Sequence, residues 1–266
     1  PLVGPKADEE VLRKIGDDGV LALVGDSTNV FKDGVAGSEA DVRESLIDLV
    51  AKYDQRVCIA SFASNVARLE TIAVVAEKTG RHAGLVGRSL WNMYEAAKEN
   101  GYLKRIKPFL SEEELMRLPR DKVLMACTGS QGEPRAALSR IASGSHPTAS
   151  LDPGDTVIFS SRIIPGNELA IGRLHDALIR EGIEIVTEKD HFVHVSGHPA
   201  RDELVQMYQW IRPQIAVPVH GEVRHMFEHQ RLARTCQVPS TKVAVNGQMV
   251  RLAPGPVEIV DEVPSG

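Results

Sequence analysis

The sequence predicts an α/β fold built around a largely parallel β-sheet. Short apolar runs rich in β-branched residues alternate with longer amphipathic segments along the 266 residues, which is the pattern of strands joined by helices. Several of these runs lead directly into a glycine-containing turn that precedes a helix, as in parallel sheets that bind ligands at the carboxyl ends of their strands. The 42% of hydrophobic and 25% of charged residues suit one large core or two modest domains.

In the first half of the chain, apolar runs predict strands and capping residues predict the helices between them. Ser38 with Asp41 forms a capping box, Asn65 can cap the next helix, and Ser111 with Glu114 marks a short helix. We expect strands at 20–24, 57–61, 83–86 and 123–127. We expect helices at 9–15, 38–53, 65–79 and 89–100, within 104–119, and at 135–142.

The second half repeats this alternation after a polar loop at 143–155. Asn167 is placed to cap a helix, and Asn246-Gly247 is a strong signal for a tight hairpin turn. We expect strands at 156–160, 183–187, 192–195 and 215–219, helices at 167–180, 202–211 and 223–234, and a closing hairpin at 243–252.

Charge and cysteine content narrow the class of protein. The formal net charge of -5 excludes a globally basic nucleic-acid-binding protein, although a local basic groove is compatible with it. Cys58, Cys127 and Cys236 lie far apart and lack CxxC spacing, so we expect reduced thiols and a cytoplasmic location. No apolar run approaches the roughly 18 residues that span a membrane, and no signal peptide opens the sequence, so we expect no membrane association. The start at Pro1 predicts a piece of a longer protein.

Two turns rich in glycine and hydroxyl groups follow predicted strands. The turn at 128–132 contains Ser130, Gln131 and Gly132, and its backbone amides can hold an anion at the start of a helix. The turn at 160–167 places Ser161 and Arg162 at the end of a strand, on the edge of the sheet that ligands favour. An equally weighted alternative is that the glycines only permit tight turns.

A Gly-Asp-Ser string that contains Asp26 and Ser27 follows the first predicted strand. An aspartate at the end of a strand commonly starts a turn. The string also resembles the nucleophile block of the SGNH esterases, with Ser27 as the nucleophile. That family needs a DxxH pair to supply the base, whereas Asp190 and His194 are spaced as DxxxH, so the esterase hypothesis is weak.

Histidines end two predicted strands in the last third of the sequence. His194 and His198 belong to the string His-Val-Ser-Gly-His, and His220 lies in Pro-Val-His-Gly-Glu. A catalytic zinc ion normally takes three protein ligands, and His191 and His194 would face opposite sides of a strand. Taken alone, these residues leave open an incomplete metal or phosphate site and histidines that are simply hydrogen-bonded.

Six segments together resemble the β-CASP branch of the metallo-β-lactamase-fold nucleases, and within it ribonuclease J. They lie at 25–29, 62–65, 128–134, 164–167, 194–198 and 218–222, in the family's order and across nearly the whole chain. The resemblance implies an α/β fold in which a β-CASP domain at 35–187 contains a parallel Rossmann-like sheet flanked by helices. It also implies that 1–34 and 188–266 are parts of an αββα metallo-β-lactamase core.

The resemblance further implies roles for individual residues. Asp26 would orient His198, His198 would act on the scissile phosphate as a general acid, and His220 would ligate one of two zinc ions. The residues implied to bind RNA phosphates are His194, Ser196, Gly197, Ser130, Gln131, Gly132, Ser161 and Arg162.

The sequence departs from the family in one respect, because it contains no HxHxDH motif, which supplies most of the family's metal ligands. We therefore expect zinc, or else manganese or magnesium, in the complete enzyme and not in this chain alone. We also expect no RNA cleavage unless the missing part is supplied. The implied partner is single-stranded RNA with a 5′-monophosphate, and the implied full-length protein is a homo-oligomer. The alternative is a stand-alone RNA- or protein-binding β-CASP module without catalysis.

Overall fold

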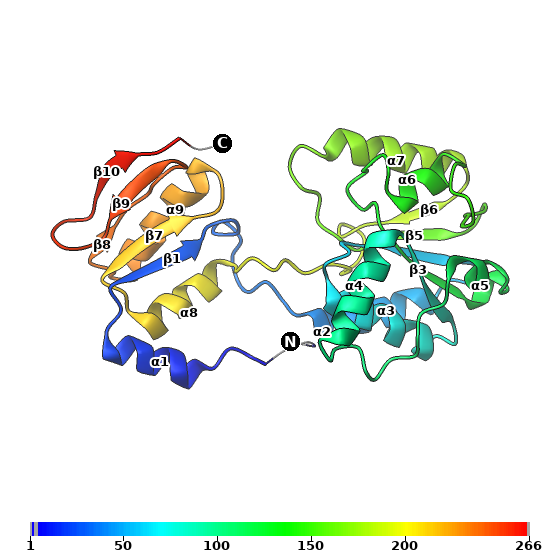
Figure 1. Ribbon diagram of the computed structural model, residues 1–266, viewed down its shortest axis with the longest axis horizontal. Helices are drawn as coiled ribbons and strands as arrows, with labels where there is room; N and C mark the ends of the chain where they lie inside the picture. The colour runs from blue at the N-terminus through cyan, green and yellow to red at the C-terminus, as the bar shows by residue number, and fades with distance from the viewer. Residues whose placement is uncertain (1, 3–4, 265–266) are drawn as a thin grey trace. The chain divides into compact units, whose positions relative to one another are not determined.

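The computed structural model describes residue 2 and residues 5–264, and these residues form two compact units. The insert unit is built from residues 38–195, and the split unit is built from residues 6–37 together with 196–264. Figure 1 labels most of the helices and strands of both units. The chain therefore leaves the split unit, completes the insert unit, and returns to finish the split unit.

The insert unit contains a five-stranded parallel sheet with the order β3-β4-β2-β5-β6. Its strands are β2 (Val57–Ala60), β3 (His82–Val86), β4 (Val123–Cys127), β5 (Thr156–Phe159) and β6 (Glu184–Val186). The three central strands are buried along their whole length, as expected for a parallel sheet that is covered on both faces.

Helices cover both faces of this sheet. They are α2 (Glu39–Val50), α3 (Val66–Lys78), α4 (Arg88–Glu99), α5 (Glu112–Met116), α6 (Ala137–Ala142) and α7 (Glu168–Arg180), with a short 3₁₀-helix at Arg120–Lys122. The β2-to-β3 connection runs along the sheet in one direction through α3, whereas the connections through α6 and α7 run in the other. Right-handed crossovers then place α3 and the α6–α7 pair on opposite faces, as Figure 1 shows.

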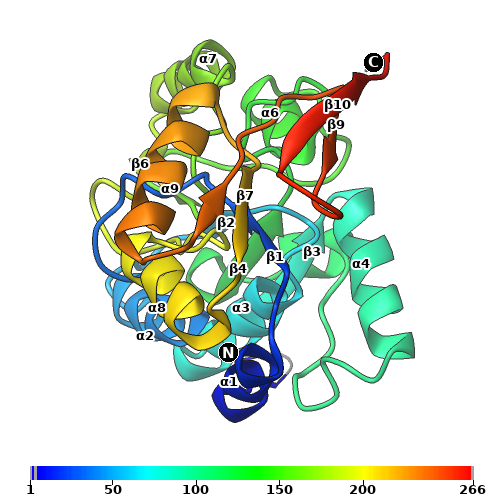
Figure 2. The ribbon, with the colours of Figure 1, turned by 90° about the vertical axis from the view of Figure 1, so that its left-hand side faces the viewer.

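The split unit contains a three-stranded parallel sheet with the order β1-β7-β8. Its elements are α1 (Glu9–Asp18), β1 (Ala22–Asp26), α8 (Arg201–Ile211), β7 (Ile215–Val219), α9 (Val223–Thr235) and β8 (Ser240–Thr241), followed by an antiparallel hairpin of β9 (Gln248–Arg251) and β10 (Glu258–Glu262). Figure 2 shows α8, α9, β1 and β7 in a view turned by 90° about the vertical axis. A small core of Tyr208, Ala216, Ala233 and Val238 joins α8, β7 and α9.

Most of the predicted elements are confirmed, often with ends shifted by one to three residues. The capping boxes at Ser38 and Ser111 and the Asn65 cap form as expected. Asn167 occupies the cap position of α7 but makes no capping hydrogen bond, and its amide nitrogen donates to the Gln131 amide oxygen. Among the described residues, no helix is long and apolar enough to cross a bilayer.

Two predicted elements are wrong. Residues 192–195 form no strand, because the Val193 carbonyl accepts hydrogen bonds from Arg68 and Ser160 and not from a neighbouring strand. The predicted hairpin at 243–252 is displaced: 243–247 is irregular, and β9 pairs with β10, a strand that we did not expect.

The Arg68 side chain organises the carboxyl edge of the insert sheet. Its guanidinium is fully buried and pairs with Glu39 at 3.0 Å, which is in the first turn of α2. It also donates to the carbonyl oxygens of Ser160 and Val193, at 2.8 and 3.2 Å. A buried guanidinium is tolerated only when such partners are present, so one side chain fixes three segments that are distant in sequence.

Candidate functional site

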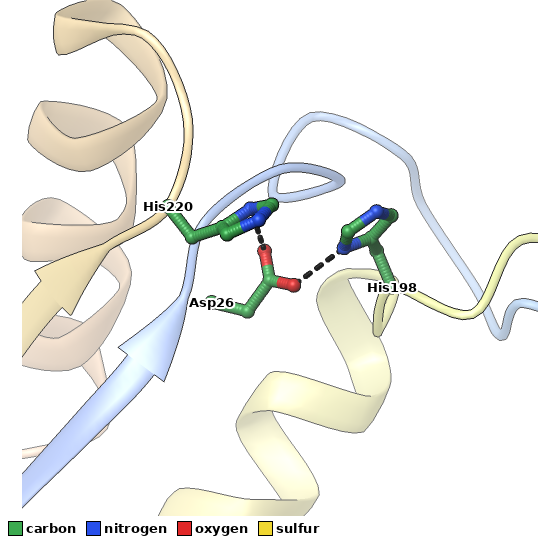
Figure 3. Close-up of side chains that lie close together, drawn as sticks. All are labelled: Asp26, His198 and His220. Carbon is green, nitrogen blue, oxygen red and sulfur yellow. Dashed lines mark hydrogen bonds and ion pairs between the residues drawn. The ribbon is translucent and has the colours of Figure 1, made fainter.

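Asp26, His198 and His220 converge in the split unit (Figure 3). In the parallel register of β1 and β7, Asp26 lies opposite Val219, so the carboxylate at the end of β1 and the histidine just after β7 are neighbours. His198 arrives from the loop that precedes α8. The three residues predicted from sequence as the chemical centre therefore meet at the carboxyl edge of one sheet.

The Asp26 carboxylate pairs with the imidazole of His198. Its Oδ2 lies 2.5 Å from His198 Nδ1, and its Oδ1 accepts the backbone N–H of Thr28 at 2.7 Å. Burial raises the pKa of the Asp26 carboxyl, but the hydrogen bonds from His198 and Thr28 outweigh it and hold the pKa below its usual value. Asp26 is therefore ionised near neutral pH and can fix the orientation of the His198 ring.

His220 is held in a less common backbone conformation. Its φ of 56° lies in the left-handed region, where residues other than glycine are strained and which is often occupied at functional sites. The Thr28 hydroxyl lies 2.9 Å from His220 Nδ1, and Asp26 Oδ1 lies 3.7 Å from the same nitrogen. The side chain is 65% exposed, so its Nε2 is accessible for a ligand.

The three side chains lie close enough to share a metal ion, and His220 is the best placed of them to ligate one. One ligand atom from each lies within 4.8 Å of the others. Metal-binding histidines usually place their second ring nitrogen on an oxygen atom, and the contact of His220 Nδ1 with the Thr28 hydroxyl fits that arrangement with Nε2 toward the ion. His198 has its Nδ1 committed to Asp26, which leaves one ring nitrogen for a substrate or a proton.

Asn29 and Ser196 shape the loop that carries His198. The Asn29 amide donates to the Ser196 hydroxyl and to the His198 carbonyl, both at 3.0 Å. The Ser196 hydroxyl also accepts the backbone N–H of His198 at 3.2 Å. As a result, Ser196 can still donate its own hydroxyl hydrogen, while Gly197 lies exposed beside it.

A buried histidine contacts Ser27, the neighbour of Asp26, and was not anticipated from the sequence. His229, on α9, is 1% exposed, and its two ring nitrogens lie 2.9 Å from the Ser27 hydroxyl and 2.8 Å from the Tyr208 hydroxyl. Burial lowers the pKa of His229 to about 4, although the charge of Asp26 opposes this. A Cβ atom on Gly25 would come within 3.1 Å of the His229 ring, so the glycine permits the close approach.

These contacts do not favour the esterase hypothesis. Ser27 is completely buried, so its hydroxyl cannot reach a substrate. Its histidine partner is His229, whereas the base suggested by the sequence was the Asp190–His194 pair, which belongs to the insert unit. Ser27 is thus a structural hydrogen-bonding residue.

In the insert unit, Gln131 joins the two glycine- and hydroxyl-rich turns. Its amide nitrogen donates to the Arg162 carbonyl at 2.9 Å and lies 3.4 Å from the Ser161 hydroxyl. Its amide oxygen accepts from Ile164 N–H at 2.9 Å. Ser130, Gln131 and Ser161 are all buried, so the turns form one rigid edge beyond β4 and β5.

The backbone amides of the first turn already have acceptors. Gln131 N–H donates to a Glu133 carboxylate oxygen at 3.0 Å, and Gly132 N–H donates to the Gly129 carbonyl at 3.1 Å. An anion could bind these amides only if Glu133 moved aside. Gly132 has φ of +73° and contacts the α7 backbone closely, so this glycine has a packing role whether or not a ligand binds.

The remaining predicted residues are placed as follows. Arg162 is exposed in the second turn, and His194 is half-buried near the end of the insert unit. The predicted site residues are therefore divided between the units: Asp26, Ser196, Gly197, His198 and His220 lie in the split unit, and the others lie in the insert unit.

Two family models match the chain. The model described as the beta-CASP domain of ribonuclease J matches residues 54–178. The model described as the Zn-dependent metallo-hydrolase RNA specificity domain matches residues 182–240. The first match lies within the insert unit, and the second includes His198 and His220.

Curated relatives match along the whole chain. A ribonuclease J of Sinorhizobium meliloti is 50% identical over 266 residues, which cover 100% of this chain and 47% of the relative. Ribonuclease J of Synechocystis is 36% identical over 269 residues, with 100% of this chain and 42% of the relative covered. Ribonuclease J of Corynebacterium glutamicum is 40% identical over 269 residues, with 100% and 38% covered. The chain thus spans about half or less of the length of these relatives.

Proposed function

Because the chain belongs to the ribonuclease J family, we propose that it supplies the β-CASP domain and part of the active site of a metal-dependent ribonuclease. The observation that carries this proposal is the meeting of Asp26, His198 and His220 at one sheet edge. A carboxylate–imidazole pair beside a metal-binding histidine is a suitable arrangement for hydrolysis of a phosphodiester.

In this proposal His198 is the general acid. Its Nδ1 is fixed by Asp26 at 2.5 Å, and its other ring nitrogen donates a proton to the leaving 3′ oxygen of the cleaved bond. The Asp26 carboxylate keeps the ring in one orientation for the transfer. Positioned general acids contribute about 10² to 10⁴-fold to a rate.

His220 is the proposed metal ligand of this chain. Zinc fits a neutral imidazole whose second nitrogen is hydrogen-bonded, and manganese or magnesium are the alternatives. When bound, the metal pair of the complete enzyme would activate water and offset the charge that develops on the phosphate. This chain contributes the orientation of His220, through Thr28 and Asp26, and the proton held on His198.

The proposed substrate is single-stranded RNA with a 5′-monophosphate. The Ser196 hydroxyl and the exposed backbone at Gly197 are next to His198 and can contact a phosphate. Contacts of RNA with His194 and with the turns that contain Ser130–Gly132 and Ser161–Arg162 are likewise proposed, since these turns lie at the ligand-binding edge of a parallel sheet.

The proposal extends to the domain assignment. We assign 35–187 to the β-CASP domain and 1–34 with 188–266 to a metallo-β-lactamase core. The boundaries of the insert unit and the split unit are similar to these, which supports the assignment. We also propose a reducing, cytoplasmic compartment, which the lack of CxxC spacing among Cys58, Cys127 and Cys236 favours. The full-length protein is proposed to be a homo-oligomer.

A non-catalytic binding module is the less favoured alternative, because the acid–base pair is fully assembled.

The experiment joins this chain, in place of the matching segment, to the remainder of the Sinorhizobium meliloti relative. We expect the chimera to cleave 5′-monophosphorylated single-stranded RNA only when zinc, manganese or magnesium is added. His198→Ala should lower the rate by about 10² to 10⁴-fold while RNA binding persists. His220→Ala should lower the affinity for the metal, which a cobalt titration followed by absorbance would measure. An inactive chimera beside an active parental relative would contradict the proposal.

A further inference from the structure

A small pocket opens at the carboxyl edge of the insert sheet. It has a volume of about 230 Å³ and lies between α7 and the segment that follows β6. Its lining includes Ser130, which follows β4, Ser161, which follows β5, and Lys189, which follows β6. Residues that follow three strands of the sheet thus meet in one hollow at the edge that ligands favour.

The wall of the pocket on the α7 side is apolar and aromatic. Phe159 and His175 pack edge to face with ring centroids 4.4 Å apart, and Ile171 adds an aliphatic surface. His175 Nε2 is buried and has no hydrogen-bond partner among the residues that the structure describes.

The rim of the pocket carries more negative than positive charge. Glu168 and Glu188 line it together with Lys189. Two carboxylates disfavour a phosphate but accept hydrogen bonds from amino and imino groups, as carboxylates do from the exocyclic amine of cytosine. The volume is below the range of about 300 to 1,000 Å³ that is usual for drug-sized ligands, so a single ring system fits and a whole nucleotide does not.

We propose that this pocket receives one unpaired nucleobase of the bound RNA. A base has apolar faces for Phe159, His175 and Ile171 and a polar edge for the Ser130 and Ser161 hydroxyls and the rim carboxylates. Proteins that bind single-stranded RNA commonly hold splayed bases in this way. The inference rests on the proposed function, because it requires that the chain contact RNA.

Gly172 allows the pocket to be blocked without disturbing the fold. It lies on α7 and lines the pocket, and a Cβ atom built on it meets nothing within 4 Å. Replacing a helical glycine favours the helix, so Gly172→Leu should fold while filling the pocket. Gly172→Ala is the matched control, because it gives the same helical gain but leaves most of the space open.

The experiment measures the affinity of this chain and both variants for a short 5′-monophosphorylated single-stranded RNA, and for copies in which one abasic residue is moved along the strand. We expect Gly172→Leu to weaken binding of the intact RNA about fivefold or more, and Gly172→Ala to have little effect. One abasic position should weaken wild-type binding to the same extent, and Gly172→Leu should cause no further loss with that RNA.

The outcomes separate this inference from the proposed function. If the wild type binds RNA but Gly172→Leu binds equally well, the pocket takes no base and RNA binding stands. If Gly172→Leu weakens every abasic RNA by the same factor, the effect is not base recognition and the inference fails. If the wild type binds none of the RNAs, the proposed RNA contact and the nucleobase inference both fail.

Discussion

At the scale of single residues, Ser27, the neighbour of Asp26, is held by a buried hydrogen bond to His229. Asp26, His198 and His220 could be identified from sequence because each belongs to a motif of a known family. His229 and Tyr208 belong to no such motif, and only the fold brings His229 to the Ser27 hydroxyl and Tyr208 to His229. In the sequence, Ser27 resembles an esterase nucleophile. Its full burial in the structure makes it a structural residue.

His229 should make the stability of the chain depend on pH. Its pKa is about 4 in the folded chain and 6.5 as an ordinary histidine, so between these values the unfolded state binds more protons. Stability is therefore lost as pH falls from about 6.5 toward 4, by up to about 3 kcal/mol for this group. Urea unfolding of the wild type and of His229→Gln, at pH 7.5 and at pH 5, would measure the effect.

The glutamine variant is the control for other titrating groups, because only the part of the pH dependence that belongs to His229 should disappear. Equal losses of stability in both proteins between the two pH values would show that His229 is not buried in its neutral form.

At the scale of elements, the strands and helices with strong local signals were predictable. Val123–Cys127 is a continuous apolar run, and the Ser38 and Ser111 capping boxes mark helix starts. Each wrong element finds hydrogen-bonding partners other than those its local sequence signals. Residues 192–195 look like a strand, but Arg68 and Ser160 take the Val193 carbonyl. Likewise, Asn246-Gly247 resembles a hairpin turn, but β9 finds its partner in β10.

The turn between β4 and α6 should be intolerant of a side chain at Gly132. A Cβ atom there would lie 2.6 Å from the Ala170 carbonyl carbon, and φ is +73°. Gly132→Ala therefore combines backbone strain with a clash against α7, and we expect it to lower the free energy of unfolding by about 2 kcal/mol or more. Denaturant unfolding would measure this.

Gly144→Ala provides the matched comparison. Gly144 has a similar φ of +66°, but a Cβ atom there meets nothing within 4 Å. It should show the backbone strain alone, about 1 kcal/mol. Similar losses in the two variants would mean that the contact of Gly132 with α7 does not constrain the turn.

At the scale of the whole chain, one unit is inserted into the other. Lys32 and Gly34 accept hydrogen bonds from the backbone N–H groups of Arg201 and Asp202, at 2.8 and 3.1 Å. The insert therefore leaves and re-enters the split unit at nearly the same point, as inserted domains commonly do. The insert unit has a hydrophobic core of its own, which explains why it can be inserted into the split unit.

Residues 38–195 should fold when produced alone. Their sheet, helices and core are complete within that range, so we expect a single cooperative unfolding transition and helical circular dichroism. A polypeptide of residues 196–264 should not fold, because β7 would lack its neighbour β1. Thermal unfolding of the two polypeptides tests this, and a disordered 38–195 would show that the insert depends on the split unit.

The pairing of β1 with β7 also brings together site residues that are synthesised at different times. Asp26 leaves the ribosome early, while His220 is made only after the whole insert. A folded insert brings the two ends of its segment together and so removes most of the loop-closure entropy that would otherwise oppose the pairing of β1 with β7. The reactive centre is consequently assembled last, and a chain that stops early carries the carboxylate without either histidine.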